Sequence, residues 1–248
     1  MKDQTRDAEP AGRPVYALAA SRGEFEPMRA RLEQSTGATF ILIQDRARLT
    51  AEYLTSQHVS RVFLPHWSYI IPASVYEKID CVVFHMTDLP FGRGGSPLQN
   101  LISRGIKETK ISALKCVKEL DAGPVYLKAP LTLDGSAEEI MARAYGIVEG
   151  MIRVLHERNP PAVPQEGMPT LFRRRTPDEG RLDDCSSVRE FYDRIRMLDA
   201  DGYPHAFIEA GGFRIEFRKA ALEGESVTAE VRIIARPEKK TAGALHAK

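Results

Sequence analysis

The runs Arg61-Val-Phe-Leu-Pro65 and Asp80-Cys-Val-Val-Phe-His85 decide the fold that this sequence predicts. Both are short and apolar, and two similar runs precede them at 15–20 and 39–43. Segments of helical composition, at 24–34 and 49–57, separate the first three runs. Short apolar strands that alternate with helices are typical of βαβ units, in which helices cover a buried parallel sheet. The sequence therefore predicts an α/β fold with an open, mostly parallel sheet.

The pattern changes after His85. A stretch rich in glycine and proline leads into a helix at 96–104, and strands at 111–118 and 125–133 precede a long capped helix at 136–158. After a proline-rich connector, a second region holds a helix at 187–198 and strands at 203–209, 213–219 and 227–234. We expect a disordered lead-in at 1–13, a main domain at 14–175, a small α+β appendage at 176–236 and a loose tail at 237–248.

Composition excludes several classes of protein. The 248 residues include 35 Lys and Arg against 34 Asp and Glu, a net charge of +1, so a nucleic-acid partner would need a local basic patch. No apolar run is long enough to span a membrane, and the charged N-terminus argues against a secretory signal. Cys81, Cys116 and Cys185 are too widely spaced for a metal site or a disulfide framework. We expect a cytoplasmic protein with reduced thiols and no metal.

Three segments would follow strands at the edge of the sheet where ligands bind, namely 65–72, 85–97 and 120–124. His85 closes an apolar strand, and Asp121 precedes Ala-Gly-Pro. Taken alone, His85 is better explained as a half-buried histidine and Asp121 as a turn residue. The glycine-rich loop at 93–97 could hold a phosphate, but it lacks the lysine and serine of a nucleotide-binding loop.

Together, these motifs resemble a known family. His85-Met-Thr-Asp-Leu-Pro90, Arg93-Gly-Gly-Ser-Pro-Leu-Gln99 and Leu120-Asp-Ala-Gly-Pro124 are similar to the motifs of formyltransferases that use N10-formyltetrahydrofolate. The spacings agree without a gap from His85 to Gly123. The resemblance implies a Rossmann-like catalytic domain, His85 as the group facing the formyl carbon, and Asp121 as its partner.

The resemblance also implies a folate pocket and shows one departure. The residues implied for the pocket are Trp67, Ser68, Tyr69, Ile70, Arg93 and Gly94. The family has an asparagine two residues before the histidine, and here that position is Val83, which cannot donate a hydrogen bond to the formyl oxygen. Gln99, Asp88, Thr87 and Ser96 lie close in the sequence and could replace this donor. We favour Gln99, although it could equally be a helix-surface or helix-capping residue. Trp67 could instead belong to the core.

The near-neutral charge and the short C-terminal region favour a particular substrate. The stretch 192–207, followed by 213–217, is similar to the region after the catalytic domain in sugar N-formyltransferases. We therefore expect a nucleotide-linked 4-amino sugar such as GDP-perosamine, used for lipopolysaccharide O-antigen, as acceptor, and no nucleic-acid partner. Alternatives are methionyl-tRNA formylation, a deformylase, and a folate-binding protein with little catalysis. Arg173, Arg174 and Arg175 could bind a diphosphate or lie on a solvated linker, and the C-terminal hairpins could pair two subunits.

Overall fold

The computed structural model describes residues 12–236, which form two compact units. Unit 1 comprises the chain up to Gly94 together with 109–131 and 143–171, and unit 2 comprises 95–108, 132–142 and the chain from Phe172 onward. The segments of the two units therefore alternate along the chain, whereas the sequence predicts a single domain boundary at residue 175. The lead-in expected at 1–13, apart from residues 12 and 13, and the tail expected at 237–248 lie outside the described residues.

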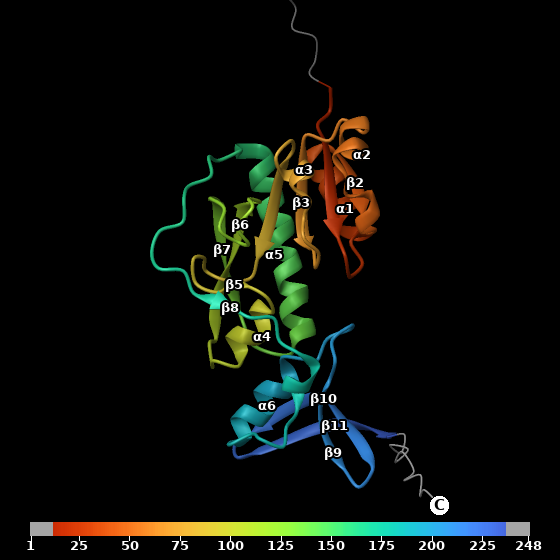
Figure 1. Ribbon diagram of the computed structural model, residues 1–248, viewed down its shortest axis with the longest axis vertical. Helices are drawn as coiled ribbons and strands as arrows, with labels where there is room; N and C mark the ends of the chain where they lie inside the picture. The colour runs from red at the N-terminus through yellow and green to blue at the C-terminus, as the bar shows by residue number, and fades with distance from the viewer. Residues whose placement is uncertain (1–11, 237–248) are drawn as a thin grey trace, which may run out of the picture. The chain divides into compact units, whose positions relative to one another are not determined.

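A six-stranded sheet forms the centre of unit 1, in the order β2-β1-β3-β4-β6-β7 (Figure 1). The strands are β1 Val15–Ala20, β2 Thr39–Ile43, β3 Arg61–His66, β4 Asp80–His85, β6 Glu108–Lys115 and β7 Val125–Thr132. The first four pair in parallel, and β6 runs antiparallel to β4, with His85 opposite Ser112. The predicted α/β class with a mostly parallel sheet is confirmed, and the strand expected at 111–118 begins and ends three residues earlier.

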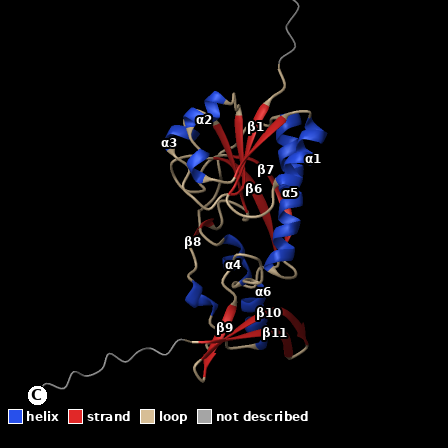
Figure 2. Ribbon diagram, turned by 90° about the vertical axis from the view of Figure 1, so that its right-hand side faces the viewer, coloured by secondary structure: helices blue, strands red, loops and turns tan. Residues whose placement is uncertain are grey.

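Helices cover both faces of this sheet, as Figure 2 shows. They are α1 Glu26–Thr36, α2 Ala51–Ser56, α3 Ala73–Tyr76 and α5 Ala137–Arg158. On the face of α2 and α3, alternate strand residues such as Val62 and Leu64 pack with Leu54 and Val75 in a buried apolar cluster. On the face of α5, the Tyr16 hydroxyl lies 3.1 Å from Nδ1 of His156. Both faces of the parallel strands are thus buried, as their continuous apolar sequence predicts.

Unit 2 contains two short helices and an antiparallel sheet with the strand order β11-β10-β9. Its elements are α4 Pro97–Ile102, α6 Val188–Arg196, β9 Ala206–Ala210, β10 Phe213–Glu223 and β11 Ser226–Ala235. Phe191 of α6 packs edge-on against Phe217 of β10, with 5.8 Å between ring centroids. The buried guanidinium of Arg196 donates to the carbonyls of Leu133 and Gly135, which fixes the segment before α5.

Four short elements have no clear signal in the sequence. They are the strands β5 Arg93–Gly94 and β8 Leu171–Phe172 and the 3-10 helices Arg46–Arg48 and Pro177–Gly180. Within unit 1, the backbone N–H groups of Gly92 and Arg93 both donate to the carbonyl of Thr170. The proline-rich connector therefore does more than join two regions, because it holds the glycine-rich loop in place.

Candidate functional site

His85 ends β4 with its imidazole buried and both ring nitrogens occupied. Nε2 lies 2.7 Å from the carbonyl oxygen of Gly92, and because a carbonyl can only accept, Nε2 must carry a proton. Nδ1 faces a carboxylate oxygen of Asp121 at 3.5 Å. The two side chains are 8% and 10% exposed, so water screens this contact little. The structure thus brings together the two residues that the motifs predict as a pair.

Asp121 occupies a strained loop position that directs its carboxylate to His85. Its φ of 51° lies in the left-handed region, and Oδ2 accepts the backbone N–H of Gly94 at 2.9 Å. Because the same oxygen faces Nδ1 of His85, the contact is attractive only when Nδ1 also carries a proton. Asp121 is therefore the group that would accept a hydrogen bond from Nδ1, while Nε2 donates to the Gly92 carbonyl.

Gln165, in the proline-rich connector, braces this pair and was not predicted from the sequence. Its Nε2 donates to the carbonyls of Asp121 and Gly123, both at 2.8 Å. Its Oε1 accepts Nε and Nη2 of Arg93 at 3.1 and 2.8 Å. One amide thus ties the Asp121 loop to the glycine-rich loop. A single glutamine in an irregular segment has no motif or periodicity that could have revealed this role.

Replacing Gln165 with leucine should lower kcat of the expected formyl transfer about tenfold, because the carbonyls of Asp121 and Gly123 lose their shared donor while the side chains of His85 and Asp121 stay. Gln165→Glu should be at least as impaired, since a carboxylate cannot donate to the two carbonyls. Steady-state kinetics and thermal unfolding should be measured together, with Gln44→Leu, an exposed glutamine of unit 1, as control. A lower unfolding midpoint with unchanged kcat would reduce Gln165 to a stabilising residue.

Gly123 allows the Asp121 loop to approach β6 closely. A Cβ built at this position would lie 1.8 Å from the carbonyl oxygen of Lys115, which is far inside van der Waals contact. Gly123→Ala should therefore displace the loop backbone and lower the free energy of unfolding by about 1–3 kcal/mol. Chemical denaturation measures this loss, and Gly146→Ala, where an added Cβ meets nothing within 4 Å, is the matched control. Equal stability of the two variants would contradict the tight packing at Gly123.

The structure gives Gln99 a different environment from the one expected. Gln99 is 4% exposed in α4 of unit 2, and its Nε2 donates to the carbonyl of Met197 at 3.2 Å. The amide thus joins α4 to the end of α6. The described contacts of Gln99 are structural, and its expected role as donor to the formyl oxygen stays a prediction without support from them.

The segment expected to line the folate pocket follows β3 directly. The Trp67 ring packs partly on the core cluster and meets Tyr69 edge-on at 5.5 Å, while Tyr69 and Ile70 are 46% and 83% exposed. The indole Nε1 of Trp67 is buried and has no hydrogen-bond partner among the described residues. A buried donor without a partner, beside exposed aromatic and aliphatic surface, fits a flat heteroaromatic ligand with acceptor atoms. Trp67 thus packs on the core with its ring and keeps its indole N–H available for a ligand.

Hydrogen bonds between the ends of β1 and β3 position this segment. The N–H of Ser21 donates to the carbonyl of His66 at 2.8 Å, and the N–H of Ser68 donates to Oγ of Ser21 at 3.0 Å. Nδ1 of His66 lies 2.6 Å from the hydroxyl of Tyr145. Burial, with a smaller contribution from Arg22, lowers the pKa of His66 and so favours its neutral form. Ser21 and His66 escaped prediction because only the fold brings them together.

The cysteines are free and show no sign of nucleophilic chemistry. Burial raises the pKa of Cys81 to about 12 and that of Cys116 to about 11, which keeps both as thiols at neutral pH.

Within residues 12–236, no three His, Cys, Asp or Glu side chains are grouped so that they could hold a metal ion. No helix of that range is long and apolar enough to cross a membrane.

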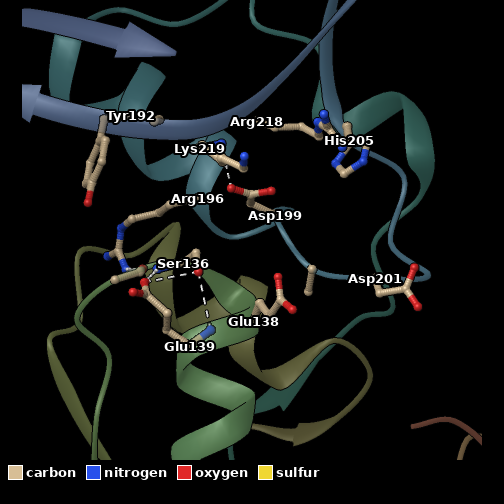
Figure 3. A pocket seen from close by; sticks show the side chains of 13 residues that line it. Ser136, Glu138, Glu139, Tyr192, Arg196, Asp199, Asp201, His205, Arg218 and Lys219 are labelled. Atoms are coloured by element: carbon tan, nitrogen blue, oxygen red, sulfur yellow. Dashed lines mark hydrogen bonds between the residues drawn. The ribbon is translucent and has the colours of Figure 1, made fainter. Parts of the chain in front are cut away.

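A pocket of about 560 Å³ lies in unit 2 (Figure 3), and the residues predicted from the sequence do not line it. Most of its charged side chains are satisfied by protein groups. Glu139 accepts the N–H of Ser136, Asp199 accepts the N–H of Lys219, and the Lys219 ammonium lies 3.0 Å from Glu230. Acidic and basic side chains both line the wall, so its formal charges give no single preference for an anion or a cation.

Comparison of the sequence and the structure with known proteins identifies the family of this chain. Residues 177–234 match the sequence model of a family described as "Methionyl-tRNA formyltransferase, C-terminal domain". A methionyl-tRNA formyltransferase from Gluconobacter oxydans is 27% identical over 217 residues, which are 82% of this chain and 66% of that protein. The solved structure titled methionyl-tRNA formyltransferase from Clostridium thermocellum is 41% identical, with a TM-score of 0.86, and the match covers 90% of this chain and 99% of that chain. The matches span 53% to 70% of the first three curated relatives.

These comparisons correct the predicted acceptor. A likely sugar N-formyltransferase from Mycobacterium tuberculosis is only 19% identical, with a TM-score of 0.68 over 86% of this chain and 99% of that chain, so the likeness shows the fold alone. The expectations of a GDP-perosamine-type acceptor and of no nucleic-acid partner are wrong. They relied on overall charge and on the stretch 192–217, which lies inside the matched C-terminal domain. The donor shared by these enzymes is N10-formyltetrahydrofolate, and the chain belongs to the family of formyltetrahydrofolate-dependent formyltransferases.

Proposed function

We propose that this protein transfers a formyl group from N10-formyltetrahydrofolate to the amino group of methionyl-tRNA. The proposal rests on one combined observation, which is the buried His85–Asp121 pair in a chain 41% identical to a protein named methionyl-tRNA formyltransferase. The match to that protein extends over 99% of its length and therefore includes both units described here. The methionyl-tRNA C-terminal domain match at 177–234 supports the same acceptor.

The His85–Asp121 pair has the two properties that acyl transfer to an amine requires. The acyl oxygen gains negative charge as the amine attacks, and the amine must lose a proton. To donate toward that oxygen, Nε2 of His85 must exchange the Gly92 carbonyl for the acyl oxygen when the donor is bound, while Asp121 compensates the positive charge. The bond from the formyl carbon to N10 then breaks, and the proton lost by the amine leaves on the N10 nitrogen of tetrahydrofolate. Gly94 and Gln165 hold Asp121 so that the carboxylate cannot swing away. N10-formyltetrahydrofolate, when bound, supplies the formyl group.

Unit 1 also offers groups that suit the donor. We assign Trp67, Tyr69 and Ile70 to contacts with its ring system, because they combine a free buried N–H with exposed apolar surface. Ser68 fixes the backbone of that segment through Ser21. Arg93 uses two of its five N–H groups on Gln165 and keeps the others for an anionic group. The N–H of Gly94 is occupied by Asp121, so we assign Gly94 a role in shaping the loop.

Val83 is the one observation that favours a second candidate, a folate-binding protein with little catalysis. Val83 packs against the apolar cluster on the α2 and α3 face, and its Cα pairs with Leu64 and Leu114 in the sheet. The side chain is partly buried and apolar, so no donor to the acyl oxygen comes from this position. Under the main proposal His85 supplies that proton alone, whereas under the second candidate the chain binds the donor and transfers little.

A transfer assay separates these functions. The protein is incubated with N10-formyltetrahydrofolate and methionyl-tRNA, and formylmethionine is quantified after base hydrolysis of the ester. Free methionine replaces the charged tRNA in the control. Transfer that depends on the tRNA confirms the proposal. Donor binding measured by calorimetry without transfer to methionyl-tRNA would overturn it in favour of the binding protein, and transfer to free methionine at the same rate would exclude a role for the RNA.

A further inference from the structure

The strand β11 forms an exposed edge of the antiparallel sheet of unit 2. The strand order β11-β10-β9 places it on the outside, and among residues 12–236 it pairs with β10 alone. Successive side chains of a strand point to opposite faces, and on one face of β11 every side chain is apolar. These side chains are Val227, Ala229, Val231, Ile233 and Ala235. Because Val231 and Ile233 are 54% and 63% exposed, this edge carries apolar surface that the rest of the described chain leaves uncovered.

The edge lacks several features that protect natural edge strands from pairing. Proline, lysine and bulges are common at such edges, because a free row of N–H and C=O groups otherwise pairs with another chain. The segment 226–235 contains no proline and no lysine. The bulge of this ribbon lies in β10, where Lys219 has a φ of 48°, so β11 itself stays regular. The two charged residues of β11, Glu230 and Arg232, have opposite signs and leave the strand without net charge.

The unpaired backbone groups of β11 belong to the residues with apolar side chains. In an antiparallel pair, the N–H and C=O groups of successive residues face opposite sides of the strand. The N–H of Arg236 donates to the carbonyl of Gly212, on the side of β10. The even-numbered residues of β11 therefore face β10, and the odd-numbered ones face outward. No backbone hydrogen bond joins 226–235 to any described segment other than β10, so the outward groups are available to a further strand.

A second copy of β11 fits this edge in a register that also matches the charges. Outward-facing residues must lie opposite one another, so the two-fold axis of an antiparallel pair passes through a residue and not between two. An axis at Val231 pairs the whole strand and sets Glu230 opposite the partner's Arg232, twice. These residues take the positions without hydrogen bonds, where facing side chains are closest. An axis one residue away, at Glu230 or at Arg232, would set like charges opposite each other, which is destabilising.

Both charged residues are able to form this contact. Arg232 is exposed and forms no ion pair with another residue of 12–236. Oε1 of Glu230 lies 3.0 Å from Nζ of Lys219, but Oε2 lies 3.8 Å from Arg218, so the second oxygen has room for a closer guanidinium. Exposed ion pairs contribute little free energy, yet they disfavour registers in which like charges meet. The charges therefore select the register, and burial of the apolar side chains stabilises it.

We propose that β11 pairs antiparallel with β11 of a second copy of this chain about a two-fold axis at Val231. The two three-stranded sheets then become one sheet of six strands. Backbone hydrogen bonds of the odd-numbered residues join the copies, as in other complexes in which a strand is added to a sheet edge. Val231 meets its own equivalent at the axis, and Ile233 lies opposite the partner's Ala229. The inference is independent of the proposed function, because it uses the residues of β10 and β11 alone.

The test measures the monomer–dimer equilibrium of the full chain by sedimentation velocity. The wild type should dimerise with a dissociation constant on the order of 10 µM, as fits a small interface. Arg232→Glu and Glu230→Arg should each weaken dimerisation about tenfold or more, because both facing pairs then carry the same sign. In a mixture of the two variants, one copy has two carboxylates and the other two guanidinium groups. The mixture should therefore form a heterodimer about as stable as the wild-type dimer, which a misfolded variant could not do.

Val231→Pro tests the hydrogen bonds at the axis. Proline removes an N–H that faces outward, so the pairing with β10 and the unfolding midpoint should change little while the dimer is lost. Lys78→Glu is the matched control for Arg232→Glu, because it makes the same change of charge at an exposed site of unit 1 and should dimerise normally.

Three results would overturn the inference. The wild type could stay monomeric at about 200 µM, well above the expected dissociation constant. A dimer could form that Arg232→Glu, Glu230→Arg and Val231→Pro leave unchanged, which would place the interface elsewhere. The mixture of the two charge variants could stay as monomeric as each alone, which would exclude the register with its axis at Val231.

Discussion

Replacing His85 with asparagine should lower kcat for formyl transfer about 100-fold while the affinity for N10-formyltetrahydrofolate changes little. Asparagine can still donate a hydrogen bond near Gly92, but it cannot take up a proton and become a cation, and general acid–base catalysis by one side chain is worth about 10²-fold or more. Formylmethionine production under saturating methionyl-tRNA gives kcat, and calorimetric titration with the donor gives the dissociation constant.

His156→Asn is the matched control, because His156 also belongs to unit 1. Its Nδ1 lies within hydrogen-bond distance of the Tyr16 hydroxyl on the face of the sheet that α5 covers. Its kcat should stay close to that of the wild type. Near-normal turnover of His85→Asn would exclude His85 as the proton donor. A comparable loss of donor affinity and of kcat would instead mean that His85 shapes the pocket and takes no part in the transfer step.

The sequence predicts the core of unit 1 well because its strands carry a strong local signal. β1, β2 and β4 have the predicted bounds, since each is an unbroken apolar run that ends at polar or glycine residues. The strand expected at 203–209 begins only at Ala206, because Tyr203 and Pro204 belong to the turn before it. The short strands β5 and β8 have no apolar period at all and form because a distant segment pairs with them.

In the candidate site, too, the residues in recognisable motifs could be predicted, and those set by tertiary contacts could not. His85 and Asp121 could be expected to pair because their motifs resemble those of a known family, and the structure places Nδ1 of His85 3.5 Å from Asp121. The contacts of Gln165 and Ser21 depend on tertiary contacts between segments of no particular pattern. The acceptor was predicted wrongly for a related reason, since a net charge of +1 averages over the whole chain and does not describe local charge.

Asp121→Asn should lower kcat by about 100-fold as well, with little change in the unfolding midpoint. The asparagine amide oxygen can keep the N–H of Gly94 and still face Nδ1 of His85, so the geometry of both contacts survives. The negative charge is what disappears. With Nε2 held to the Gly92 carbonyl, an imidazolium beside a neutral amide has no counter-charge, and a neutral imidazole turns a lone pair toward an oxygen.

Comparison with Asp121→Ala separates charge from position. Alanine removes the charge and also leaves the N–H of Gly94 without its acceptor, so this variant should lose donor affinity and stability in addition to kcat. If only the position of the loop mattered, Asp121→Asn would turn over normally and Asp121→Ala alone would fail. If the charge supports the His85 imidazolium, both variants lose kcat to a similar extent and differ in donor affinity. The second pattern is expected, because the oxygen that anchors Gly94 is the same oxygen that faces His85.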